Sequence, residues 1–201
     1  METRKRGRPR SFDRDEALRQ ATRVFFEHGY EAASIADLTR AMGIGPPSLY
    51  AAFGDKRALF AEAVDVYQAA RPLGLDAAPT ARAAFEGLLR SLAADYTDPA
   101  HPPGCLVINA ALNCADAEVV ADLRARRQAS AAAFERRVQD DVDAGLLPPD
   151  TDSAALARFV GAVVQGMSIQ ARDGAGRTEL ESVVELALGS WPQRREERHG
   201  P

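Results

Sequence analysis

Helical periodicity is the feature of this sequence that most restricts its fold. Apolar residues recur every three or four positions through most of the chain, and few stretches alternate strictly between apolar and polar residues. Alanine, the residue with the highest helix propensity, is abundant. The pattern therefore predicts an all-α fold of about nine helices, each with one apolar face.

Glycine, proline and capping residues indicate where these helices begin and end. Gly29 is expected to end the first helix, and Ser34 with Asp37 predicts an approximate capping box for the second. Residues 72–79 are expected to form a loop. The expected helices cover about 13–28, 34–42, 46–53, 55–70, 80–97, 104–114, 117–144, 152–172 and 178–190.

The bulk properties exclude several classes of protein. The 201 residues suffice for one or two domains with a sizeable core. No apolar run approaches the roughly 20 residues of a membrane span, and the basic N-terminus lacks the apolar core of a secretory signal. Two cysteines make no disulfide framework, and no metal cluster is apparent. We therefore expect a cytoplasmic protein with no membrane partner and no cofactor.

The net charge of -4 is unevenly distributed along the chain. Residues 1–60 hold 11 Lys and Arg against 8 Asp and Glu, whereas the remainder holds 14 against 21. A basic N-terminal third joined to an acidic remainder indicates that only the N-terminal part meets a polyanion. Chance alone could also produce so small an excess.

Residues 43–56, GIGPPSLYAAFGDK, join the second and third expected helices through a glycine-containing turn. Two short helices joined in this way, with a preceding helix as a brace, are typical of a helix-turn-helix. Pro46 and Pro47 suit the first turn of a helix, where missing N–H groups cost little. A plain helical corner would show the same pattern. The third helix also lacks the Arg, Lys, Asn and Gln side chains that read base edges best.

The stretch from Phe12 to Phe60 resembles the DNA-binding domain of TetR-family transcriptional regulators. The matching features are a first helix ending in Phe-x-x-x-Gly-Tyr, then Ser-Ile-x-x-Leu, Gly-Ile, Ser-Leu-Tyr-x-x-Phe and Lys-x-x-Leu. The resemblance implies a homodimer that places one helix-turn-helix per subunit in successive major grooves of a pseudo-palindromic operator. It also implies a helical effector-binding and dimerisation domain. The expected division is a basic disordered arm at 1–10, a DNA-binding domain at 11–56, the second domain at 57–191 and a disordered tail at 192–201.

The resemblance also assigns DNA contacts by matching position. Lys56, Ser34 and Tyr50 are expected at phosphates, through the ammonium group, hydroxyls and N–H groups at helix starts. Proline and alanine offer apolar contacts, which suit thymine methyl groups, so an A/T-containing operator is expected. The positions expected at the DNA along the third helix are Pro46, Pro47, Ser48, Tyr50, Ala51 and Ala52.

The N-terminal arm RKRGRPR is expected to supply part of the affinity. Its Arg-Gly-Arg-Pro-Arg sequence resembles the core of an AT-hook, whose arginines enter narrow, A·T-rich minor grooves. Arg6, Arg8 and Arg10 are therefore predicted to follow the minor groove or the DNA backbone. A solvated tail is the alternative interpretation.

The second domain contains candidate sensor residues. Cys105 is expected to begin the helix at 104–114, where the helix dipole would favour a thiolate, and Cys114 to lie on its opposite face. The segment also resembles a branch of the family with Pro-Gly-Cys at the start of the sixth helix, some members of which respond to electrophiles or oxidants. A small buried side chain is the alternative role for Cys105. The candidates for an effector pocket or sensor are Tyr67, Tyr96, Cys105, Asn109 and Gln165.

The eighth expected helix carries small and apolar residues on one face, which permit close approach of another helix. The candidate dimer contacts are Ala157, Gly161, Val164 and Met167, and an intrachain core is the alternative for each. The favoured function is a repressor released from its operator by a small-molecule, electrophile or oxidant effector, and not an enzyme. Two alternatives remain: a thiol-dependent enzyme with Cys105 and His101, and an architectural DNA binder without an effector.

Overall fold

The computed structural model describes residues 12–111 and 114–192, and all regular structure within these ranges is helical. This confirms the predicted all-α fold. The helices are α1 Arg14–Ala32, α2 Ile35–Met42, α3 Pro46–Phe53, α4 Lys56–Ala69, α5 Ala81–Tyr96, α6 Leu106–Asn109, α7 Ala117–Asp143, α8 Ser153–Arg172 and α9 Arg177–Gly189.

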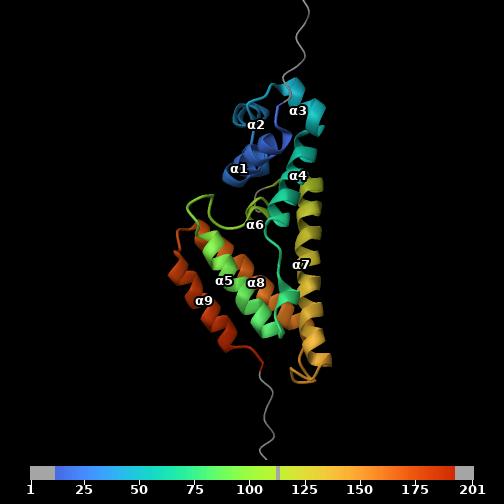
Figure 1. The fold of residues 1–201 in the computed structure, drawn as a ribbon, viewed down its shortest axis with the longest axis vertical. Coiled ribbons are helices and arrows are strands. Elements are labelled where there is room, and N and C mark those ends of the chain that lie inside the picture. The colour runs from blue at the N-terminus through green and yellow to red at the C-terminus, as the bar shows by residue number, and fades with distance from the viewer. Residues whose placement is uncertain (1–11, 112–113, 193–201) are drawn as a thin grey trace, which may run out of the picture.

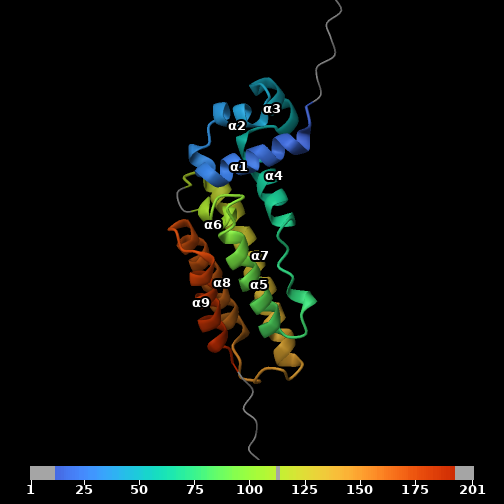
Figure 2. The same ribbon diagram turned by 60° about the vertical axis from the view of Figure 1, so that its left-hand side comes forward.

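The described chain forms an elongated molecule with a helical head at one end (Figure 1). α1, α2 and α3 make up the head, and α4 runs from it toward the remaining helices. α5, α7, α8 and α9 lie roughly along the long axis and pack against one another to form the body (Figure 2). α4 thus connects the head to the body.

Local capping explains the helix boundaries of the head. Asp13 caps α1 by accepting the N–H groups of Asp15 and Glu16 at 3.0 Å. Gly29 interrupts the helical geometry with φ of 75° and ψ of 176°, and a last turn then continues to Ala32, beyond the predicted end at about residue 28. The Ser34 hydroxyl accepts the N–H of Asp37 at 3.1 Å, as the sequence predicted.

Aromatic side chains fill the junction between α1 and α4. The rings of Phe25 and Phe60 meet edge to face with centroids 5.0 Å apart, and Tyr30 packs on Phe60 at 5.2 Å. This cluster continues past residue 56 to buried residues of α6 and the start of α7, including Leu106 and Leu123. The head is therefore seated on the body through a continuous apolar core.

A buried ion pair ties α5 to α7. Arg137 lies 2.6 Å from the carboxylate of Asp141, and both side chains are buried. The second carboxylate oxygen of Asp141 accepts the N–H of Ala81 at 2.7 Å, while Arg137 donates to the carbonyl oxygens of Leu75 and Ala78. The pair satisfies a backbone N–H at the start of α5 and two carbonyl oxygens of the segment that precedes it.

Two expectations about local structure are corrected. The predicted loop at 72–79 contains a short 3₁₀-helix, Leu75–Ala77. The helix expected at 104–114 is only the single turn α6, because Gly104 has φ of +84° and Cys105 is extended, with φ of -118° and ψ of 126°. Cys105 thus precedes α6, and the argument that placed Cys105 and Cys114 on opposite faces of one helix does not apply.

Candidate functional site

The turn between α2 and α3 has the geometry of a helix-turn-helix. Gly43 ends α2 in the left-handed region at φ of 67° and ψ of 26°, which glycine adopts without a steric penalty. Its N–H donates to the carbonyl of Arg40 at 3.3 Å, and the next N–H, of Ile44, donates to Thr39 at 3.1 Å. Pro46 and Pro47 then occupy the first turn of α3, where no N–H group is needed.

One face of α3 is buried and the other is free. Leu49 and Phe53 are buried in the head core, so they orient the helix. Tyr50 is 49% exposed, which leaves its hydroxyl available to a partner. The structure thus separates the core positions of α3 from the predicted contact positions. Five predicted contact residues are exposed: Pro46, Pro47, Ser48, Tyr50 and Ala51.

The other predicted contacts are partly occupied within the chain. Lys56 is half-buried: its ammonium group lies 4.5 Å over the Tyr30 ring and donates to the Glu31 carbonyl at 3.3 Å. Ser34 uses its hydroxyl to cap α2. The carbonyl of half-buried Ala52 accepts a hydrogen bond from Arg14 at 3.2 Å. These interactions fix the positions of Lys56 and Ser34 before any ligand is bound.

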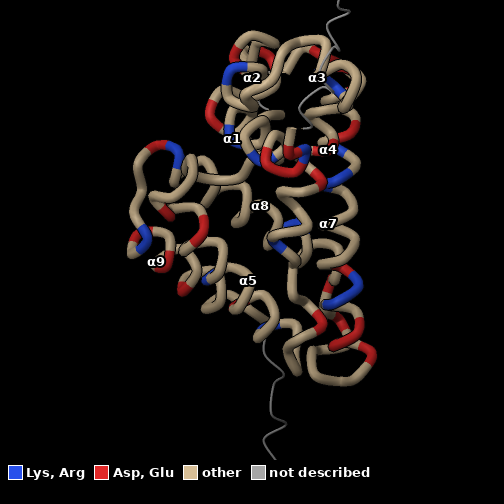
Figure 3. Tube along the Cα trace, turned by 45° about the horizontal axis from the view of Figure 1, so that its top comes forward, with Lys and Arg blue, Asp and Glu red and all other residues tan. Residues whose placement is uncertain are grey.

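The folded part of the head is more acidic than basic. Residues 12–56 hold five Lys and Arg against seven Asp and Glu. α3 contains no charged residue, so the coloured segments around it in Figure 3 belong to neighbouring elements. The arginines of α1 and α2 pair with acids: Arg14 with Glu62, Arg19 with Glu16, Arg23 with Glu27 and Arg40 with Asp37.

The arm has the opposite balance. Residues 1–11 hold five Lys and Arg against one Glu, and Arg6, Arg8 and Arg10 lie there, outside the described residues. The positive excess of the first 60 residues therefore comes from the arm and not from the folded head.

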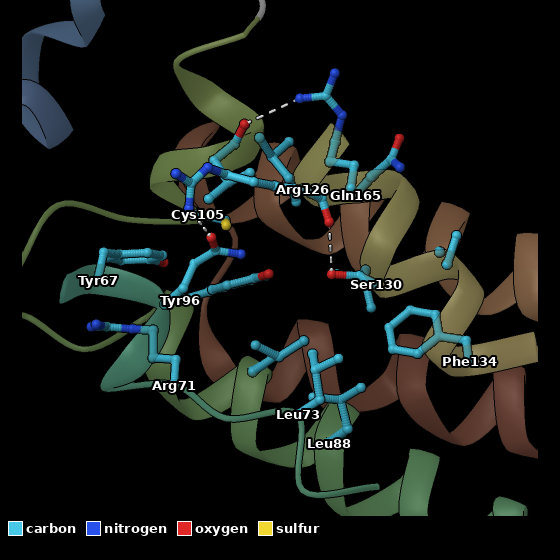
Figure 4. Close-up of a pocket in the computed structure, with 18 residues that line it drawn as sticks. Tyr67, Arg71, Leu73, Leu88, Tyr96, Cys105, Arg126, Ser130, Phe134 and Gln165 are labelled. Atoms are coloured by element: carbon cyan, nitrogen blue, oxygen red, sulfur yellow. Dashed lines mark hydrogen bonds between the residues drawn. The ribbon is translucent and has the colours of Figure 1, made fainter. Parts of the chain in front are cut away.

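The body contains a partly open cavity of about 140 Å³ between α4, α5, α6, α7 and α8 (Figure 4). Its walls are largely apolar, with Leu88 and Leu92 from α5, Phe134 from α7 and Val164 from α8. A mostly apolar pocket with a few polar groups is typical of a small-molecule site.

Four of the five candidate sensor residues line this cavity: Tyr67, Tyr96, Cys105 and Gln165. Burial is the largest factor that raises the pKa of the Tyr67 and Tyr96 hydroxyls, and the neighbouring Cys105 thiol adds to it. Both hydroxyls therefore stay protonated and can donate hydrogen bonds near neutral pH.

Asn109 lies outside the cavity and has a structural role. Its amide donates to the carbonyl of Pro103 at 3.2 Å, and its oxygen accepts the Ser168 hydroxyl at 3.2 Å. The same Ser168 hydroxyl accepts the N–H of Cys105 at 2.9 Å. Asn109 and Ser168 thus fix the turn at Gly104, which positions Cys105 at the cavity wall.

Sequence reasoning missed three arginines that line the cavity: Arg71, Arg126 and Arg127. Arg71 pairs with Asp95 at 2.9 Å and lies 4.2 Å over the Tyr67 ring. Arg126 lies 2.6 Å from Asp65 of α4 and 2.8 Å from Asp122. No short motif marks these residues, because their shared position depends on how α4 and α7 pack.

Comparison with known proteins decides what kind of protein carries these features. Residues 17–63 match "Bacterial regulatory proteins, tetR family", and residues 81–185 match "Tetracyclin repressor-like, C-terminal domain". The HTH-type transcriptional repressor ComR of Escherichia coli (strain K12) is 33% identical over 198 residues, which cover 94% of this chain and 93% of that protein. The chain belongs to the TetR family.

Solved structures of TetR-family members agree in fold. A cysteine mutant of the regulator CifR, in complex with 26-bp double-strand operator DNA, is 47% identical with a TM-score of 0.86, covering 92% of this chain and all of that one. A putative TetR regulator from Rhodococcus sp. RHA1 is 39% identical with a TM-score of 0.61, covering 90% of this chain and all of that one. The protein is thus a DNA-binding transcriptional regulator of the TetR family, and its relatives are regulators rather than enzymes.

The predicted dimer contacts of this TetR-family chain need correction. Ala157 is 2% exposed and Met167 is fully buried within the chain, so neither can offer its side chain to a second copy. Gly161 and Val164 line the cavity. The face of α8 that carries these small residues therefore packs against the rest of the same chain.

Among the described residues, no helix combines the length and the apolar character that a membrane span requires.

The thiol-enzyme alternative requires His101 to act as the base for Cys105. His101 does not line the cavity; its imidazole lies 3.2 Å from Asp95 and stacks on Phe26 of the head, with ring centroids 5.7 Å apart. For Cys114, burial is the largest factor that raises the thiol pKa, and Glu31 raises it further. Of the two cysteines, only Cys105 lines the cavity.

Proposed function

We propose that this regulator is a repressor that binds a pseudo-palindromic operator as a homodimer and leaves it when an effector occupies the body cavity. The observation that carries the proposal is the free face of α3, together with 47% identity to a regulator solved on operator DNA. The repressor title of ComR supports the direction of regulation. Such a protein acts on chromosomal DNA in the cytoplasm.

At the operator, α3 lies in the major groove with Pro46, Pro47 and Ala51 against the base edges. These side chains offer shape and methyl contacts, which favour thymine. Tyr50, Ser48 and Lys56 hold the phosphate backbone. Because the folded head is acidic overall, Arg6, Arg8 and Arg10 of the arm supply much of the attraction to DNA.

The second copy covers the outer faces of α8 and α9. Phe159 on α8 is 40% exposed and Leu186 on α9 is 78% exposed, which is unusual for large apolar side chains on packed helices. A twofold contact through these helices would bury both residues. This face replaces the inward face that contains Ala157 and Met167.

The effector acts through the cavity. α4 contributes Tyr67 and Gln68 to the cavity wall and begins at the head, so a ligand that displaces α4 would also move α3. Effector binding would then favour a head spacing that no longer matches the operator. An architectural DNA binder would need no such cavity.

Selection of bound fragments from a random DNA pool tests the repressor proposal. The expected result is one enriched palindromic site that contains A/T pairs at the α3 contacts, with two half-sites about one helical turn apart. Recovery of no preferred sequence would contradict the proposal. A site with guanine contacts at the α3 positions would contradict the mode of recognition.

Cys105 offers a second, covalent route to release. Its half-buried side chain lines the cavity, so a small electrophile that enters could reach the thiol. Alkylation should release the operator from the wild-type protein but not from Cys105→Ser, measured as loss of the gel-shift complex. Equal release from both proteins would exclude Cys105, and Cys114→Ser is the matched control.

A further inference from the structure

The cavity in the body carries a positive charge that the described chain does not balance. None of the lining residues is an aspartate or a glutamate, whereas three are arginines. Acids outside the cavity neutralise two of them: Asp95 pairs with Arg71, and Asp65 and Asp122 pair with Arg126. The excess charge at the cavity therefore belongs to the third arginine.

That arginine is Arg127. Among the described residues it has no carboxylate partner; its guanidinium group donates to the carbonyl of Val107 at 3.4 Å, a long contact. Burial lowers the pKa of Arg127, and repulsion from Arg124 lowers it further. A half-buried cation without a counter-ion is costly, and an anion in the cavity would relieve that cost.

A second polar group at the cavity has no nitrogen or oxygen partner. Tyr67 is 6% exposed, and among the described residues its buried hydroxyl interacts only with the thiol of Cys105, a weak acceptor. Tyr67 from α4 and Arg127 from α7 both line this cavity. Figure 4 shows Tyr67 and Cys105 on the same side of the cavity. A hydroxyl donor and an unpaired cation in the wall of one cavity suit an oxygen-bearing anion.

The size of the cavity limits the rest of the ligand. Its volume of about 140 Å³ is close to the roughly 150 Å³ of an engineered protein cavity that binds benzene. Leu88, Leu92 and Phe134 provide an apolar wall for a body of that size. One unpaired cation matches one negative charge.

We propose that the effector is a small amphipathic monocarboxylate, with its carboxylate on Arg127 and the Tyr67 hydroxyl, and a ring-sized apolar body against Leu88 and Phe134. This deepens the proposed function by assigning a chemical class to the effector. Arg127 selects for the negative charge of the ligand, and Leu88, Leu92 and Phe134 limit the size of the ligand's apolar part.

Calorimetric titration of the full chain with benzoate, in the absence of DNA, tests this proposal. Benzamide is the matched neutral probe, because it has nearly the same shape without the charge. Benzoate should bind at least tenfold more tightly than benzamide, since a hydrogen bond to a charged group is stronger than a neutral one. Even a weak ligand of this size should bind at concentrations up to about 10 mM. Equal affinities for the two probes, or no benzoate binding in this range, would overturn the proposal.

Variants of Arg127 test whether its guanidinium group binds the carboxylate of benzoate. Arg127→Gln should weaken benzoate binding roughly ten- to hundredfold and leave benzamide binding unchanged, whereas Arg127→Lys should retain part of the preference. Arg136→Gln, a change at an exposed arginine of the same helix that does not line the cavity, is the control and should bind benzoate like the wild type. An unchanged benzoate affinity in Arg127→Gln would overturn the proposal.

Two further variants test the role of Tyr67 and the role of the cysteines in benzoate binding. Tyr67→Phe should weaken benzoate binding, and because the hydroxyl has no nitrogen or oxygen partner in the free protein, it should change the free energy of unfolding little. Cys114→Ser, at the cysteine that does not line the cavity, should leave benzoate binding unchanged; loss of binding there would contradict a site confined to the cavity. Because the titration contains no DNA, its failure is distinguishable from failure of the operator selection.

Discussion

Gly104 occupies a position where only glycine fits, for two separate reasons. Its φ of +84° is one that residues with a side chain rarely adopt, and an added Cβ would lie 2.6 Å from the carbonyl oxygen of Ser168. We therefore expect Gly104→Ala to lower the free energy of unfolding by roughly 2–5 kcal/mol, measured by urea denaturation. The change would also displace Cys105 from the cavity wall.

Gly87 provides the control, because it lies inside α5 with nothing within 4 Å of an added Cβ. Gly87→Ala should raise the free energy of unfolding by about 0.5–1 kcal/mol, since alanine loses less backbone entropy in a helix. A Gly104→Ala protein as stable as the wild type would show that the turn can relax.

At the scale of elements, the Arg137–Asp141 pair joins the 3₁₀-helix Leu75–Ala77, α5 and α7. Arg137→Met should destabilise the protein by about 3–5 kcal/mol, because Asp141 would remain buried without its counter-ion. The double variant Arg137→Met/Asp141→Leu should recover part of this loss. Denaturant unfolding of Arg137→Met, Asp141→Leu and the double variant measures the coupling between the two residues. Additive losses of stability would show that they do not act as a pair.

The junction between the head and the body is sensitive to pH through Glu31. Its carboxylate accepts the N–H groups of Ala115 at 2.7 Å and Asp116 at 3.1 Å, and these hydrogen bonds lower its pKa. A carboxyl whose pKa is lower in the folded state stabilises that state above its unfolded pKa, near 4.3, and loses this effect as pH falls through the folded value.

Glu31→Gln should therefore be less stable than the wild type at pH 7, and the difference should shrink below about pH 4. The measurement is the free energy of unfolding across this pH range. Glu135→Gln, at an exposed glutamate of α7 with no ion pair in the described chain, should differ little at either end. A difference that is independent of pH would argue against the hydrogen-bonded carboxylate as its source.

At the scale of the whole molecule, attraction to DNA should depend on the arm. The triple variant Arg6→Ala/Arg8→Ala/Arg10→Ala should weaken operator binding and reduce the slope of log K against log salt by about 3 per subunit. Deletion of residues 193–201, which also removes three arginines, should leave that slope unchanged. Fluorescence anisotropy over a salt series compares the two, and equal slopes would refute the role of the arm.

The assembly should depend on the outer faces of α8 and α9. Leu186→Glu should weaken dimerisation by roughly tenfold or more, because it places a charge in the proposed interface. Leu146→Glu, at a residue 50% exposed beyond the end of α7, is the control and should assemble like the wild type. Sedimentation velocity distinguishes dimer from monomer, and an unaffected Leu186→Glu dimer would place the interface elsewhere.

Predictions from the sequence were accurate where the deciding interactions are local, and they failed where those interactions join distant positions of the chain. The head was predictable because its signals are local: Ser34 caps the helix that follows it, Gly43 turns the chain, and Leu49 and Phe53 share one face over a single turn. The short α6 was missed because the conformations of Gly104 and Cys105 depend on Ser168, more than 60 positions away.

The sequence by itself determined the helical fold, the helix-turn-helix and the separation between a basic arm and an acidic remainder, because composition and short-range periodicity contain that information. Periodicity shows that a face is buried, but it does not show what covers it. Only the tertiary structure decided that Ala157 and Met167 pack inward while Phe159 and Leu186 remain exposed. Likewise, Arg127 stands out only when α4 and α7 are packed, since their packing pairs Arg126 with Asp65 and leaves Arg127 without an acid at the same cavity.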